Sequence, residues 1–136
     1  MAEILVLGRE HWQAMRRHVR RRAPLEACGL LAGKSGRVRI TLGVPNQERS
    51  PVRYCMEPRA QWRAFERIEA AGLELLGIYH SHPQSPDHPS PTDVEDSLYD
   101  VAQLIWFPSR SGWQVRAFRI TAGSVTDITL VIENGV

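Results

Sequence analysis

Strand-like and helix-like segments alternate along this chain, and the alternation limits its fold more than any other feature. Helices are expected over residues 9–22 and 58–71, and a third is expected to start near Ser90. Strands are expected over residues 4–7, 27–32, 37–44, 74–82, 101–107, 113–120 and 125–132. Interleaved helices and strands indicate a central sheet with helices packed on it.

The two longer helices are recognised by apolar residues spaced three and four positions apart. These residues are Trp12, Met15 and Val19 in the first helix and Trp62, Phe65 and Ile68 in the second. Pro24 follows the first helix, whereas Pro58 suits the first turn of the second helix and Gly72 its end. We therefore expect both helices to pack through these apolar faces.

The length of 136 residues fits one domain with one core, spanning residues 1–136. No apolar run approaches the roughly 20 residues of a membrane helix. The first residues, Met-Ala-Glu-Ile-Leu-Val-Leu, lack the basic region and the length of a signal peptide. We expect a cytoplasmic protein with no membrane partner.

The cysteines and the arginines suggest more ordinary roles. Cys28 and Cys55 are too few for a disulfide scaffold and are not spaced as a zinc ribbon, so we expect two buried free thiols. The densest basic cluster lies in the first predicted helix, at Arg16, Arg17, Arg20, Arg21 and Arg22. No aromatic residues interleave with it, which favours a solvated helix face over a nucleic-acid site. An acidic protein partner is a third interpretation.

One predicted strand ends in the run His80-Ser81-His82-Pro83. Because side chains alternate along a strand, His80 and His82 share one face and Ser81 points to the other. Two imidazoles can bind one metal at about 2.0–2.1 Å each. After a loop the chain returns with Asp93, whose carboxylate would complete three ligands and leave a fourth position for water. This set is typical of a catalytic zinc site.

The segment Ser90-Pro91-Thr92-Asp93 also has a simpler interpretation as a helix start. Serine suits the N-cap, proline the first position and aspartate the third. A lone His-x-His is likewise more often a pair of ordinary histidines than a metal site. The combination of the two segments favours the metal. Ser90 can serve both roles, whereas we expect the Asp93 carboxylate to serve the metal or the backbone, not both equally well.

Together these segments resemble the signature of the JAMM (MPN+) zinc metalloproteases. That pattern is His-x-His, about seven residues, then Ser-x-x-Asp, with a glutamate on an early strand. Residues 26–33 resemble the family's Glu-x-Cys-Gly-Leu-Leu-x-Gly strand, and Asn46 and the run 77–79 agree as well. The resemblance spans nearly the whole chain and points to the small stand-alone bacterial and archaeal branch.

The resemblance implies an α/β fold in three layers, a cytidine-deaminase-like mixed β-sheet flanked by helices. By position, His80, His82 and Asp93 match the ligands of one Zn²⁺. Glu26 matches the acid/base residue that moves a proton from the attacking water to the leaving amine. Ser90 matches the hydroxyl that supports the oxyanion. None of these five positions departs from the family pattern.

The resemblance also implies a substrate. Family members hydrolyse amide or isopeptide bonds at the C-terminus of ubiquitin-like proteins, and the short branch acts on sulfur carriers of that kind. The alternative is a non-catalytic binding module, as in metal-free members. Zinc deaminase chemistry needs His-x-Glu and Cys-x-x-Cys, which this sequence lacks. No nucleic-acid partner is expected, and a homodimer is compatible with the sequence.

Overall fold

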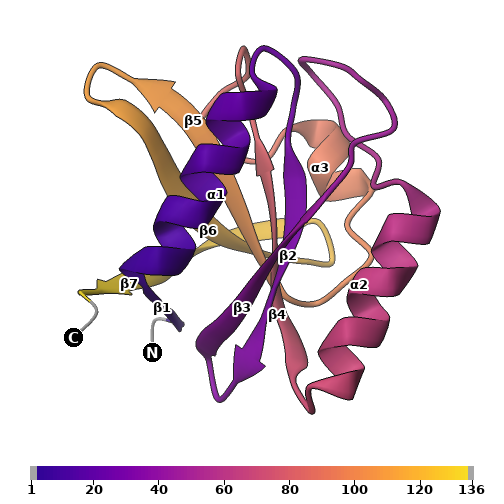
Figure 1. Ribbon diagram of the computed structural model, residues 1–136. Coiled ribbons are helices and arrows are strands. Elements are labelled where there is room, and N and C mark those ends of the chain that lie inside the picture. Colours follow the sequence, from indigo (N-terminus) through magenta and orange to yellow (C-terminus); the bar gives the residue numbers. More distant parts are fainter. Residues whose placement is uncertain (1–2, 135–136) are drawn as a thin grey trace.

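The computed structural model describes residues 3–134, and its elements follow the predicted order closely (Figure 1). They are β1 (Ile4–Gly8), α1 (Arg9–Arg22), β2 (Cys28–Lys34), β3 (Arg37–Val44), α2 (Pro58–Ala70), β4 (Glu74–Ser81), α3 (Pro91–Glu95), β5 (Ala102–Ser109), β6 (Gly112–Thr121) and β7 (Ser124–Glu133). No helix within residues 3–134 is long and apolar enough to cross a membrane.

The strands form one mixed sheet that closes on itself in the order β1-β3-β2-β4-β5-β6-β7. Closure depends on β1, which pairs in parallel with β7 over five residue pairs and meets β3 at the single pair Val6–Arg37. The α/β class is therefore confirmed. The strand pairing does not specifically show the expected three layers, because β1 has neighbours on both sides and joins the two ends of the sheet.

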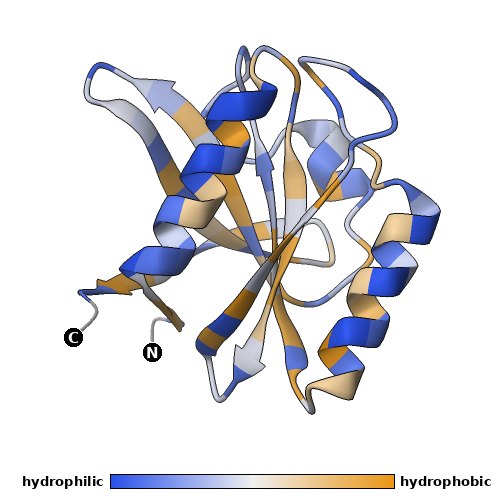
Figure 2. Cartoon of the chain, in the orientation of Figure 1, coloured by the Kyte–Doolittle hydropathy of each residue, from blue (hydrophilic) through white to orange (hydrophobic). Residues whose placement is uncertain are grey.

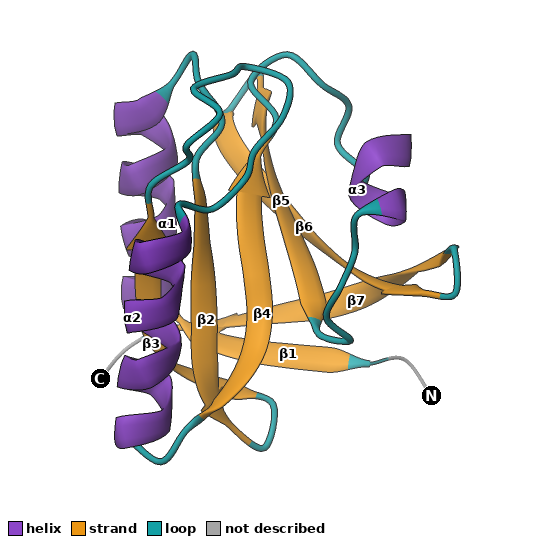
Figure 3. Cartoon of the chain, turned by 90° about the vertical axis from the view of Figure 1, so that its right-hand side faces the viewer, coloured by secondary structure: helices purple, strands orange, loops and turns teal. Residues whose placement is uncertain are grey.

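The central strands β2 and β4 separate two apolar cores. Successive side chains of a strand point to opposite faces, so Leu31 of β2 packs on the α1 side and Leu30 on the α2 side. The colouring of Figure 2 shows hydrophobic residues along these strands and polar residues on the outer faces of the helices. In Figure 1, α1 lies on one side of β2 and β4, and α2 and α3 lie on the other; Figure 3 shows α3 well separated from α2. The space between α2, α3 and the sheet is where the predicted site residues lie.

Two predictions about individual side chains need correction. Trp62 is 64% exposed, although it was expected on the apolar face of α2. Ala64 and Ile68 are buried instead, and Trp62 lies about 200° around the helix from Ala64 because each residue turns about 100°. The expectation of two buried thiols holds only for Cys28, since Cys55 is exposed.

Candidate metal centre and active site

The end of β4 presents the two histidines as the alternation of side chains predicted. His80 and His82 are each 1% exposed, and their Nε2 atoms lie 3.0 Å apart. Ser81 points the other way, where its hydroxyl accepts the backbone N–H of Ala27 at 2.8 Å. The N–H of Ser81 in turn donates to the carbonyl of Ala27 at 3.0 Å. These two bonds join the end of β4 to the residue that follows Glu26.

Asp93 brings a carboxylate oxygen to the same point. Its Oδ2 lies 3.2 Å from Nε2 of His80 and 3.1 Å from Nε2 of His82. The same atom accepts the backbone N–H of Ser90 at 2.8 Å, and the Ser90 hydroxyl accepts the N–H of Asp93 at 3.0 Å. One oxygen of Asp93, with lone pairs on two sides, thus faces the imidazoles and also caps α3, so the expected competition between the two roles stays a prediction.

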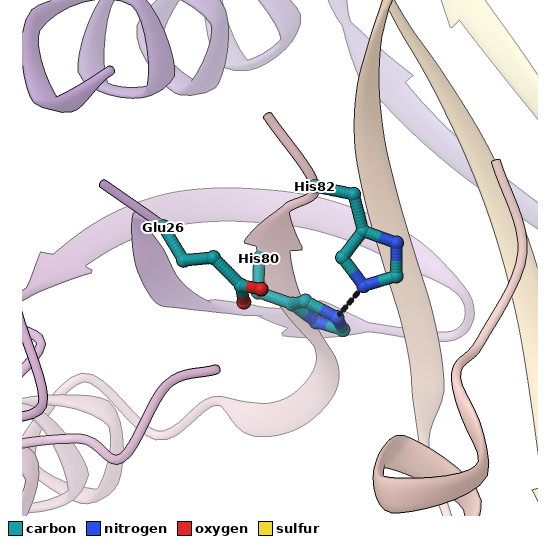
Figure 4. Close-up of side chains that lie close together, drawn as sticks. All are labelled: Glu26, His80 and His82. Carbon is teal, nitrogen blue, oxygen red and sulfur yellow. Dashed lines mark hydrogen bonds between the residues drawn. The ribbon is translucent and has the colours of Figure 1, made fainter. Parts of the chain in front are cut away.

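Glu26 supplies a second carboxylate from the segment just before β2. It is 2% exposed, and one ligand atom each from Glu26, His80 and His82 lie within 4.8 Å of one another (Figure 4). Its Oε1 is buried and has no hydrogen-bond partner among residues 3–134. Burial raises the pKa of Glu26 to about 8, with His82 opposing and Asp93 adding to the rise. This carboxyl can therefore hold or release a proton near neutral pH.

The two imidazoles are held in different ways. Nδ1 of His82 donates to the carbonyl of Pro86 at 2.7 Å, which leaves the lone pair of Nε2 toward the cluster. Nδ1 of His80 is buried without a partner in the described part of the chain. Burial lowers the pKa of His80. Burial also acts to lower the pKa of His82, but hydrogen bonds to Asp93 and Pro86 outweigh it and raise that pKa.

The distances between the ligand atoms of the cluster can be compared with those of a zinc site. In a tetrahedral site with ligands at 2.0–2.1 Å, neighbouring ligand atoms lie about 3.3 Å apart. The two histidine Nε2 atoms and Oδ2 of Asp93 form a triangle with edges of 3.0, 3.2 and 3.1 Å. Two nitrogens and one carboxylate oxygen are donors that zinc accepts. The donor set and its spacing therefore fit the metal.

Three residues that support the site were not given these roles by sequence reasoning. Asn46 is 6% exposed, and its Nδ2 donates to the carbonyls of Glu26 at 3.1 Å and Arg53 at 3.2 Å. The ring of Tyr54 stacks on His80. Ser81 joins the end of β4 to Ala27, the residue before β2, through its hydroxyl. The sequence singled out Asn46 only through the family resemblance.

Comparisons with known proteins agree with this geometry. The chain matches the family described as "Prokaryotic homologs of the JAB domain" over residues 8–124. It is 36% identical over 130 residues to the "Probable TtuB-protein conjugate cleaving protease" of Thermus thermophilus, covering 95% of this chain and 83% of that protein. It is 35% identical over 128 residues to the "CysO-cysteine peptidase" of Mycobacterium tuberculosis, covering 91% of this chain and 88% of that protein.

Among solved structures, the solution structure of protein DSY2949 from Desulfitobacterium hafniense is similar, with a TM-score of 0.86 and 27% identity over 97% of this chain and 94% of that one. The chain therefore belongs to the family of prokaryotic JAB-domain homologues. The resemblance drawn from the motifs is confirmed, and so is the peptidase class, because both curated relatives are named as a protease or a peptidase.

Proposed function

We propose that this protein is a zinc-dependent peptidase or isopeptidase that hydrolyses the amide bond at the C-terminus of a ubiquitin-like, sulfur-carrier-type protein. One observation carries the proposal: the buried, unpartnered carboxylate of Glu26 lies beside a cluster of His80, His82 and Asp93. A metal-ligand set alone is compatible with a structural site. An acid/base group beside it is what hydrolysis requires.

The three ligands have separate supports. His80 and His82 would hold the metal through Nε2, and Asp93 through Oδ2. When bound, Zn²⁺ acts as a Lewis acid and brings the pKa of a coordinated water to about 7. The carbonyl of Pro86 orients the His82 ring, and the cap of α3 fixes Asp93. Backbone contacts thus position His82 and Asp93 without a metal, whereas the ring of His80 stacks on Tyr54.

Glu26 is the proton carrier of this proposal. Its Oε1 has no competing hydrogen bond from residues 3–134, so it can accept a proton from the attacking water and pass it to the leaving amine. A pKa of about 8, raised by burial, suits both transfers near neutral pH. The backbone of Glu26 is fixed, because its N–H donates to the carbonyl of Ser50 at 2.8 Å and its carbonyl accepts from the side-chain amide of Asn46.

Ser90 serves as the hydrogen-bond donor to the developing oxyanion. Its oxygen already accepts the backbone N–H of Asp93 at 3.0 Å, which fixes the hydroxyl in place. That bond uses a lone pair and leaves the hydroxyl proton free to donate. Ser90 also lines the cavity beside the cluster, where a substrate carbonyl would lie.

The arginines of α1 are proposed to meet an acidic face of the carrier. Arg17, Arg21 and Arg22 line a hollow of about 670 Å³ together with His18. None of these three arginines forms an ion pair within residues 3–134, and Arg22 precedes Glu26 by only four residues. Charge at this place would steer association. The association rate should fall steeply with added salt, and a salt-independent rate would refute this role.

The proposed activity is tested by incubating zinc-loaded protein with a carrier–peptide fusion and following the products by mass spectrometry. The wild type should release the carrier with its native C-terminus, His82→Ala should release none, and His11→Ala, altered at a histidine of α1, should match the wild type. Cleavage by His82→Ala at the wild-type rate would refute the proposal. A wild type that contains no zinc when purified without chelator, and cleaves nothing, would indicate the non-catalytic binding module.

A further inference from the structure

A cavity of about 450 Å³ opens directly beside the cluster of His80, His82 and Asp93. Among the residues that line it are Ser90, Asp93, Tyr54, Ile78 and Gln103. Of these residues, Ile78 and Gln103 have no role in the hydrolysis proposed above. Its volume falls within the range of about 300–1,000 Å³ that is usual for sites that hold a ligand.

Gln103 is a polar residue of this cavity whose side chain has no protein partner among the described residues. It is 6% exposed, and its side-chain amide makes no hydrogen bond to any residue between 3 and 134. Its amide atoms are not among the fully enclosed ones without a partner, so the amide opens into the cavity. Because the amide is accessible from the cavity and has no protein partner in the described part of the chain, it is free to hydrogen-bond a molecule that enters there.

The pairing of β4 with β5 places Gln103 near the cluster of His80, His82 and Asp93. Gln103 of β5 pairs with Ile78 of β4 in parallel register, and His80 follows Ile78 by two residues on the same face. Two residues of an extended strand span about 6.5–7 Å. An extended peptide that ran along β4 past the cluster would bring a peptide unit about two residues from the cleaved bond near Gln103.

We propose that Gln103 is a substrate-binding residue that hydrogen-bonds a main-chain peptide unit of the substrate about two residues from the cleaved bond. A glutamine amide offers both donors and an acceptor, which matches the N–H and C=O of a peptide unit. The rim of the same cavity carries exposed apolar side chains, Val52 at 60% and Leu98 at 86%, which suit contact with a peptide. This inference rests on the proposed peptidase function.

The test compares Gln103→Leu with Gln114→Leu, an exposed glutamine on β6. With the carrier–peptide fusion as substrate, Gln103→Leu should raise KM about tenfold and leave kcat within about twofold, because the contact exists in ground and transition states alike. Gln114→Leu should behave as the wild type. An unchanged KM in Gln103→Leu, or a fall in kcat alone, would overturn the proposal.

A binding measurement keeps the test independent of turnover and of the stability of the leucine variant. In ¹⁵N-labelled Glu26→Gln protein, the side-chain amide signals of Gln103 should shift when the uncleaved fusion is added. Signals that stay in place at saturating fusion would overturn the proposal. If the wild type cleaves nothing while these signals shift, the peptidase function fails and the peptide subsite stands.

Discussion

The ring of Tyr54 stacks on the imidazole of His80, with ring centroids 4.5 Å apart and ring planes inclined by 24°. The other histidine of the cluster, His82, is oriented by a hydrogen bond from its Nδ1 to the carbonyl of Pro86. His80 has no such bond, since its Nδ1 is without a partner in residues 3–134. The aromatic contact therefore supports the imidazole whose Nδ1 has no hydrogen bond to the described residues.

Removing this contact should weaken metal binding. We expect Tyr54→Leu to lower zinc affinity about tenfold, at the low end of the effects seen when supports of metal ligands are lost. Tyr54→Phe keeps the stacked ring and should bind zinc with nearly wild-type affinity. Competition with a chromophoric chelator measures both values. If Tyr54→Leu binds as tightly as the wild type, the stacking does not position His80.

Asp93 allows its two roles to be separated. Asp93→Asn keeps an oxygen that can accept the N–H of Ser90, whereas Asp93→Ala removes the acceptor. In metal-free protein at pH 8, Asp93→Ala should lose about 1 kcal/mol of unfolding free energy and Asp93→Asn much less. Both should bind zinc weakly, because both lose the negative charge. Urea unfolding and zinc titration test this, and equal losses of stability would contradict the capping role.

His18 gives the stability of the protein a pH dependence. Burial, with Arg21 and Arg22, lowers the pKa of His18 to about 4, compared with about 6.5 in the unfolded chain. The unfolded state therefore takes up this proton first, so the contribution of His18 to stability is complete above pH 6.5 and falls as the pH is lowered toward 4. His18→Gln should lack this fall.

The measurement is the difference in unfolding free energy between wild type and His18→Gln from pH 8 to pH 4. Taking the difference cancels the carboxylates, which titrate in both proteins. The difference should shrink or reverse as the pH falls through this window. A constant difference would mean that the fold does not disfavour the charged form of His18.

Local patterns predicted much of the fold and part of the site. Alternation along β4 correctly placed His80 and His82 on one face, because that property depends only on neighbouring residues. The position of Asp93 required the loop before α3 to return to the strand end, which the combination of the two segments suggested and the family resemblance supported. Glu26 was singled out by resemblance only, since a lone acid before a strand has no distinguishing pattern.

What the sequence did not predict depends on contacts between distant segments. The closing pair of β1 and β7 joins residues more than one hundred positions apart, such as Leu5 and Leu130, and no local pattern encodes it. Tyr54 lies in an irregular loop, where neither helical nor strand periodicity applies. Gln103 sits within an apolar strand, and its unusual environment appears only once β4 is placed beside it.

The role of Glu26 is tested most directly by the rate at which Glu26→Gln cleaves the carrier–peptide fusion when it carries one zinc per chain. Glutamine has nearly the same shape and keeps the cluster intact but cannot carry the proton. The rate should fall by about 10²–10⁴-fold relative to the wild type at equal zinc content. A Glu26→Gln protein that holds zinc and cleaves the fusion at the wild-type rate would contradict the proposed mechanism.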